Sequence, residues 1–110
     1  KYTQMHIDFL IEKDGVVIGK AGAWRLPEIG YLLHPDHWGQ GLAQEAMTAL
    51  IAHLHHIRPE LTHLIAEVDP RNTASLRLLT RLGFVETGRA ERTMQWGDEW
   101  CDSIYLRRDY

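Results

Sequence analysis

The spacing of apolar residues along the chain predicts two amphipathic helices. Over residues 41–57 the apolar positions recur at the i, i+3, i+4 and i+7 spacing of one helical face. A second helix is expected to begin at Asn72 or Thr73, either of which can cap it, and to end at Gly83. Both helices would pack their apolar faces on a sheet.

Shorter apolar segments between these helices predict strands. The Asp14-Gly15 pair is typical of a hairpin turn between the first two strands. The expected strands are residues 5–11, 16–22, 28–33, 61–68, 84–85, 92–96 and 103–107. This order indicates the α/β (α+β) class, with one domain over residues 1–110 built on a single mixed sheet. Because a helical crossover joins strand 28–33 to strand 61–68, these two strands should run parallel, and ligands bind at the carboxyl ends of such strands.

Composition narrows the function without defining it. The chain has 110 residues, of which 45% are hydrophobic and 25% charged, as in ordinary globular proteins. Its 12 basic and 15 acidic residues leave a net charge of −3 and no basic stripe, so nucleic acid is not an expected partner, and a cationic amine is a better one. One cysteine and no apolar run of membrane-spanning length favour a cytoplasmic protein without a membrane partner.

Small residues stand where strand 28–33 ends and the first helix begins. The segment Trp38-Gly39-Gln40-Gly41-Leu42-Ala43 follows the break at His34-Pro35. The first N–H groups of a helix have no partner inside it, and glycines let a ligand approach the main chain. Phosphate oxygens are suitable ligands for these groups, although the glycines could equally shape an empty tight turn. Gln44 stands where a dinucleotide-binding loop needs its third small residue, and no lysine follows Lys20 to complete a P-loop.

Three blocks of the sequence resemble the GCN5-related N-acetyltransferase (GNAT) family. Trp38, Gly41 and Ala43 stand at the three defined positions of its acetyl-CoA-binding motif, and residues 72–84 resemble its Asn-x-x-Ser-x-x-Leu-x-x-x-x-Gly-Phe block. Residues 97–106 resemble the closing turn and strand of the ribosomal-protein N-terminal subgroup, with Asp102 at the recurrent acidic position. The Trp-Gly-x-Gly-x-Ala variant and the strand 28–33 before it also resemble that subgroup.

The resemblance implies a fold and a set of coenzyme contacts. The expected fold is a mixed, mostly antiparallel sheet with helices on both faces and a central parallel strand pair that splays apart to admit the pantetheine arm. Acetyl-CoA would be the co-substrate, and no metal is expected, because no third ligand accompanies His53 and His56. The implied coenzyme-binding residues are Leu33, Trp38, Gly39, Gln40, Gly41, Leu42, Ala43 and Asn72. For Asn72, helix capping remains an equal alternative.

The implied reaction transfers acetyl from a thioester to an amine by direct attack. Glu28 and Glu67 are the candidates for the base, because both lie on strands that border the gap, although a solvated carboxylate is the commoner fate of glutamate. Ser75 would stabilise the departing sulfur or simply cap the second helix. Tyr31 fits the core better than the acceptor gap, and Cys101 fits a packed thiol better than a nucleophile.

The family's first strand and helices have no counterpart here, since the chain opens almost directly on strand 5–11. Their absence would leave an edge strand and apolar surface exposed, and a homodimer or a preceding segment is expected to cover them. The predicted function is an acetyl-CoA-dependent N-acetyltransferase that acts on a small amine or a protein N-terminus. A non-catalytic acyl-CoA-binding or scaffold domain is the alternative.

Overall fold

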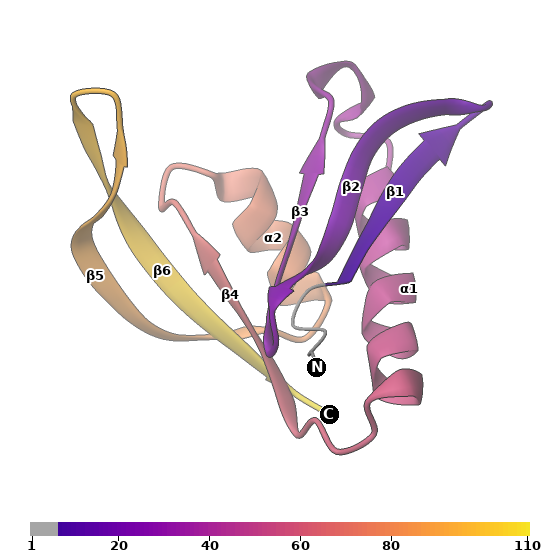
Figure 1. Cartoon of the computed structure of the whole chain (residues 1–110). Helices are drawn as coiled ribbons and strands as arrows, with labels where there is room; N and C mark the ends of the chain where they lie inside the picture. The colour runs from indigo at the N-terminus through magenta and orange to yellow at the C-terminus, as the bar shows by residue number, and fades with distance from the viewer. Residues whose placement is uncertain (1–6) are drawn as a thin grey trace, which may run out of the picture.

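The computed structural model describes residues 7–110, apart from the side chains of Ile7, Trp24, Met94 and Trp96. Six strands, two α-helices and a short 3-10 helix alternate along the chain. Their bounds are β1 Ile7–Lys13, β2 Val16–Arg25, β3 Glu28–Leu33, η1 Pro35–His37, α1 Leu42–Ile57, β4 His63–Val68, α2 Thr73–Arg81, β5 Val85–Trp96 and β6 Glu99–Asp109 (Figure 1). Both predicted helices are confirmed, and β3 has the bounds that the sequence predicts.

The strands form one sheet in the order β1-β2-β3-β4-β6-β5. Every neighbouring pair is antiparallel except β3 and β4, which run parallel as the crossover through α1 requires. Asp14 and Gly15 have φ values of 54° and 81°, which is the backbone of the predicted hairpin turn between β1 and β2. The mixed, mostly antiparallel sheet is therefore confirmed.

The helices pack on one face of this sheet. In β4 the residues Leu64, Ala66 and Val68 are buried, whereas Ile65 and Glu67 alternate with them and are exposed on the other face. The buried positions of β4 join one core with side chains of both helices. In α1 that core takes four side chains at the predicted helical spacing, and burial of each stabilises the fold by about 1.5–3 kcal/mol; they are Met47, Leu50, Ile51 and Leu54.

A strand pair shows that α1 and α2 share this face. Ala21 of β2 lies beside Leu50 of α1 in an apolar groove, and it pairs with Tyr31 of β3 on the same side of the sheet. Tyr31 in turn contacts Ser75 of α2. This placement differs from the helices on both faces that the resemblance implies, because both α-helices of residues 7–110 lie on one face and leave Ile65 and Glu67 of β4 exposed on the other.

The C-terminal hairpin is more continuous than the sequence predicts. Residues 84–85 and 92–96 were expected as separate strands, but β5 runs through both and pairs with β6 along its length. Most of the segment between them pairs with β6, and the register shifts twice, between Glu86 and Gly88 and, at a bulge, between Ala90 and Met94. Arg92 occupies the bulge with a φ of 54°, and its N–H donates to Asp102 Oδ1 at 3.0 Å. A polar bulge interrupts the alternation by which strands are recognised in a sequence.

Candidate active site at the gap between β3 and β4

The parallel strands β3 and β4 touch only near the amino end of β3. Glu28 pairs with Ile65, and Ile65 N donates to Pro27 O at 2.9 Å; among residues 7–110 no later residue of β3 pairs with β4. Figure 1 shows the two strands diverging toward their carboxyl ends, with α2 seen between them. The predicted splayed pair is confirmed, and it leaves a gap into which backbone groups of β3 face.

The register with β2 identifies these backbone groups. His34 N donates to Ile18 O at 2.7 Å, so Leu33, which pairs with Gly19, belongs to a non-hydrogen-bonded pair and turns its own N–H and C=O toward the gap. Leu33 O accepts a hydrogen bond from Trp38 Nε1 at 2.8 Å. Leu33 therefore presents main-chain groups where the sequence analysis expects them, and the indole of Trp38 occupies one of them.

The glycine-rich loop follows directly, where η1 gives way to α1. Gly41 is the N-cap of α1 with a φ of 77°, which favours glycine, and it makes no side-chain cap hydrogen bond. A Cβ on either Gly39 or Gly41 would meet no atom within 4 Å, so the space above the loop is open. The first helical hydrogen bond runs from Glu45 N to Gly41 O at 3.0 Å, and the N–H groups that precede it point out of the helix end.

Side chains from two other elements border this loop. Gln40 Oε1 accepts from Lys13 Nζ of β1 at 3.0 Å, and its amide nitrogen approaches Asp36 O at 3.5 Å. Arg81, at the end of α2, donates from Nε to Gln44 Oε1 in the first turn of α1 at 3.3 Å. Leu42 and Ala43 begin the helix and are partly buried. Positive charge at the loop thus comes from distant segments, since residues 26–57 contain neither lysine nor arginine.

The first turn of α2 reaches the gap from the helix face. Asn72 is the N-cap, and its Oδ1 accepts from Ser75 N at 3.1 Å, which confirms the capping alternative for Asn72. Ser75 is buried, with its hydroxyl 2.7 Å from the hydroxyl of Tyr31. Sequence reasoning placed Tyr31 in the core, and it does pack there in part, but its hydroxyl lies on Ser75. Sequence reasoning missed this contact, although a partly buried tyrosine hydroxyl usually has a hydrogen-bond partner.

The two candidate carboxylates lie on the opposite face of the sheet. Glu28 pairs with Ile65, so it shares the face of Ile65 and Glu67. Glu28 lies where β3 and β4 still touch, whereas Glu67 stands near the carboxyl end of β4, where the strands have separated. Glu67 Oε2 accepts a hydrogen bond from the hydroxyl of Ser103 on β6. Sequence reasoning gave no role to Ser103, and only the register of β4 with β6 shows the contact.

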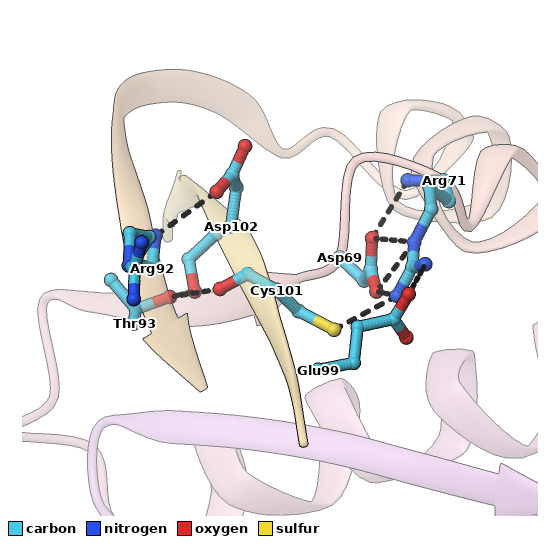
Figure 2. Close-up of polar contacts among 8 residues, drawn as sticks. Asp69, Arg71, Arg92, Thr93, Glu99, Cys101 and Asp102 are labelled. Carbon is cyan, nitrogen blue, oxygen red and sulfur yellow. Dashed lines mark hydrogen bonds and ion pairs between the residues drawn. The ribbon is translucent and has the colours of Figure 1, made fainter. Parts of the chain in front are cut away.

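An ion-pair cluster lies just beyond the carboxyl end of β4. Figure 2 shows Arg71 between Asp69 and Glu99, with Cys101 below its guanidinium. Arg71 Nη2 lies 2.8 Å from both Asp69 Oδ2 and Cys101 Sγ, and hydrogen bonds from Arg71 lower the pKa of Asp69 to about 2. Cys101 is buried, and burial raises the pKa of its thiol, which fits a packed thiol rather than a nucleophile.

Comparison with known proteins identifies the fold family. The acetyltransferase (GNAT) domain family matches residues 1–85. This chain belongs to the GNAT family. The L-amino acid N-acyltransferase MnaT of Escherichia coli (strain K12) is 30% identical to this GNAT domain over 105 residues, which cover 87% of the chain and 60% of MnaT. The GNAT domain thus spans well under two thirds of that relative.

Two solved structures share the arrangement of this GNAT domain. The structure of yncA, a putative acetyltransferase from Salmonella typhimurium with its cofactor acetyl-CoA, is 26% identical with a TM-score of 0.80, covering 94% of this chain and 64% of its own. The ribosomal-protein-S5-alanine acetyltransferase from Vibrio fischeri is 25% identical with a TM-score of 0.85, covering 96% and 62%. Within residues 7–110, no helix is long and apolar enough to cross a bilayer, and no three side chains are grouped to hold a metal ion.

Proposed function

We propose that this chain is the catalytic part of an acetyl-CoA-dependent N-acetyltransferase. The observation that carries the proposal is the β3–β4 gap that leads directly to the open, glycine-rich N-terminus of α1. A gap alone would hold many ligands, and a helix end alone would hold many anions. Their succession matches a ligand with an extended amide arm and a diphosphate, and the similar yncA structure holds acetyl-CoA.

The proposed coenzyme contacts follow the chain from β3 to α2. The N–H of Leu33 would pair with an amide of the arm, and Trp38 would move its indole or pack along it. The loop and first helical turn would hold the diphosphate through main-chain N–H groups; these residues are Gly39, Gln40, Gly41, Leu42 and Ala43. Asn72 would use its amide nitrogen, since its oxygen already caps α2.

The reacting groups would approach the gap from opposite faces of the sheet. Ser75 lies on the helix face, and Glu67 lies on the other face. The amine nitrogen would attack the thioester carbon from the Glu67 side and lose a proton to that carboxylate, directly or through water. The carbon–sulfur bond would then break, and the Ser75 hydroxyl would donate a hydrogen bond to the departing thiolate. Glu28, at the closed end of the gap, is the second candidate for the base.

The acceptor is proposed to be an α-amino group, of a protein N-terminus or a small amine. An α-amino group has a pKa near ~8 and a lysine side chain has a pKa near ~10.4. At neutral pH a single carboxylate therefore removes the proton of an α-amino group more easily than that of a lysine. Two of the similar proteins are named for such acceptors, one for L-amino acids and the other for an alanine of a ribosomal protein. Membership of the ribosomal-protein N-terminal subgroup, and with it a cytoplasmic location, belongs to this proposal.

A homodimer is proposed for the exposed edge of the sheet. Strand β1 forms that edge, and Phe9 and Leu10 on it are 42% and 64% exposed beside an apolar groove against α1. A second copy, or a segment of a longer chain, would bury these side chains. Sedimentation of the intact protein tests this: a monomer with the groove covered by its own chain would contradict the dimer.

Turnover of the intact protein tests the enzymatic proposal. Release of free thiol from acetyl-CoA should occur with at least one acceptor in a panel of amino acids, small amines and N-terminal peptides. Ser75→Ala should lower kcat about 10-fold to 100-fold, since a hydrogen bond to a charged group contributes about 1.5–3 kcal/mol. Thr80→Val removes a hydroxyl from the same helix and should leave kcat unchanged. A protein that binds acetyl-CoA but turns over no acceptor would support the scaffold alternative instead.

A further inference from the structure

A row of hydroxyl groups leads from the C-terminal hairpin to Glu67. Ser103 on β6 is fully buried at 0% exposure, and its hydroxyl donates to Glu67 Oε2. Thr93 Oγ1 on β5 makes a short hydrogen bond with Ser103 Oγ. An ionised carboxylate can only accept hydrogen bonds, so Ser103 gives its one proton to Glu67 and Thr93 must donate to Ser103. Within the row, donation therefore runs from Thr93 through Ser103 to Glu67, and Cys101 O, 3.4 Å from Thr93 Oγ1, is a second acceptor for the Thr93 hydroxyl.

The bulge in β5 explains why Thr93 reaches Ser103. Without an extra residue, strict pairing of β5 and β6 would continue past Ala90 and Ser103. The register shifts there, with Arg92 in a left-handed conformation that Asp102 Oδ1 holds through the Arg92 N–H. Figure 2 shows Asp102 of β6 joined to Arg92 of β5 in this way, with Thr93 following Arg92 on β5. Bulges commonly redirect a side chain next to a functional site.

The burial of Ser103 indicates that its hydrogen bonds matter to the structure. A serine hydroxyl with no exposure costs free energy unless it is hydrogen-bonded, and a strand position facing Glu67 could hold an alanine or valine instead. Glu67 itself is exposed, and a free glutamate side chain samples several rotamers. A hydrogen bond to Oε2 restricts those rotamers and leaves Oε1 available to accept a proton.

We infer that Ser103, supported by Thr93, is a positioning residue that aims the Glu67 carboxylate at the acceptor amine. The inference rests on the proposed function, in which Glu67 is the base. Holding a base in its reactive orientation before substrate arrives raises the rate of proton transfer and leaves the coenzyme site untouched. The effect should therefore appear in kcat and not in the KM for acetyl-CoA.

The test compares kcat and both KM values in the intact protein. Ser103→Ala should lower kcat about tenfold, less than the 10²–10⁴-fold that a general base itself contributes, with the KM for acetyl-CoA unchanged. Thr93→Val, at an exposed position that tolerates the change, should lower kcat severalfold, and Thr93→Ser should restore it. Thr87→Val is the matched control, because Thr87 is on the same strand and its hydroxyl bonds only to Tyr105 O.

A double variant separates positioning from a merely structural role. Glu67→Gln removes the base, so Ser103→Ala added to it should lower kcat no further. Full kcat in both Ser103→Ala and Thr93→Val, with Glu67→Gln impaired, would overturn this inference and leave the proposed function standing. Full kcat in Glu67→Gln would overturn it as well. A wild-type protein that turns over no amine would instead contradict the proposed function. Should Ser103→Ala fail to fold, Thr93→Val against Thr93→Ser decides the outcome.

Discussion

Asn72 shows how one side chain serves both a helix and the gap between the strands. Its Oδ1 accepts from Ser75 N and so satisfies one of the first N–H groups of α2. Among residues 7–110, its Nδ2 has no hydrogen-bond partner, and a coenzyme amide carbonyl is a suitable one. The two roles that the sequence leaves as alternatives use different atoms of the same amide.

Asn72→Asp separates these roles. Aspartate caps a helix as well as asparagine does, so the free energy of unfolding should change by less than about 0.5 kcal/mol. The donor is lost, however, and the affinity for acetyl-CoA should fall about tenfold, which is about 1.4 kcal/mol. Titration calorimetry and thermal unfolding measure both quantities. Asn72→Ala, which loses cap and donor, is the comparison, and an aspartate variant with wild-type affinity would show that Asn72 only caps α2.

Asp69 gives the fold a pH dependence at acid pH. Hydrogen bonds from Arg71 lower the pKa of Asp69 from 3.8 to about 2, so its ionised form is favoured in the folded state. A carboxyl group whose pKa is lower in the folded than in the unfolded chain stabilises the fold at pH values above its pKa in the unfolded chain. The contribution of Asp69 is therefore complete above pH 3.8 and disappears as the pH falls to about 2.

Asp69→Asn should therefore reduce stability at pH 7 and lose its effect near pH 2. Urea unfolding at several pH values measures the difference between variant and wild type. Glu60→Gln, which removes a carboxylate that is 60% exposed against 25% for Asp69, should have a smaller effect at pH 7. A deficit in Asp69→Asn that stays constant down to pH 2 would mean that the lost contact is not ionic.

Among the elements, the helices and β3 follow from the sequence because their local signals agree. Apolar spacing, the caps of α2 and the break at Pro35 all mark the bounds that the structure has. The loop residues and Ser75 were chosen on the resemblance to the GNAT motifs, and their roles remain predictions. The contacts of Glu67 with Ser103 and of Ser75 with Tyr31 join residues 36 and 44 positions apart. The register of β4 with β6 brings the first pair together, and the packing of α2 on the sheet brings the second pair together. The bulge of β5 is set by Asp102 across the hairpin, and no local pattern encodes it.

The glycine-rich loop makes a prediction of its own. Gly41→Asp should abolish the thermal shift that acetyl-CoA produces, because a carboxylate would face the diphosphate. Gly41→Asn is the matched control: both residues tolerate a φ of 77° better than others, and only the charge differs. At 100 times Kd the ligand should stabilise the wild type by about 2.7 kcal/mol. Equal shifts in the two variants would show that the diphosphate lies elsewhere.

The close contact between β2 and β3 at Gly19 leads to a further prediction. A Cβ on Gly19 would lie 2.2 Å from Leu32 O, so Gly19→Ala must push the strands apart just before Leu33. We expect a loss of about 1–3 kcal/mol in unfolding free energy and weaker acetyl-CoA binding. Gly88→Ala, where a Cβ would meet no atom within 4 Å, should change neither. A fully stable Gly19→Ala variant would contradict the close approach of these strands.

The whole molecule is a sheet with both described helices on one face, and its parallel strands β3 and β4 separate beyond Glu28. The other face is not uniformly polar, because Leu32 and Ile65 are exposed on it at 62% and 37%. The glycine-rich loop and Ser75 belong to the helix side, whereas Glu67, Ser103 and Glu28 belong to the other side. The gap between β3 and β4 is where groups from the two sides can meet. Under the proposed function, the thioester and the amine would approach from opposite sides, so a substitution on one side should spare the KM of the substrate that binds from the other side.

A crystal structure of the protein with coenzyme A tests the central claim most directly. The account predicts the diphosphate within hydrogen-bond distance of the main-chain N–H groups from Gly39 to Ala43, with the arm running along β3 past Leu33. A nucleotide bound at any other surface, with side chains filling the space above Gly39 and Gly41, would contradict it.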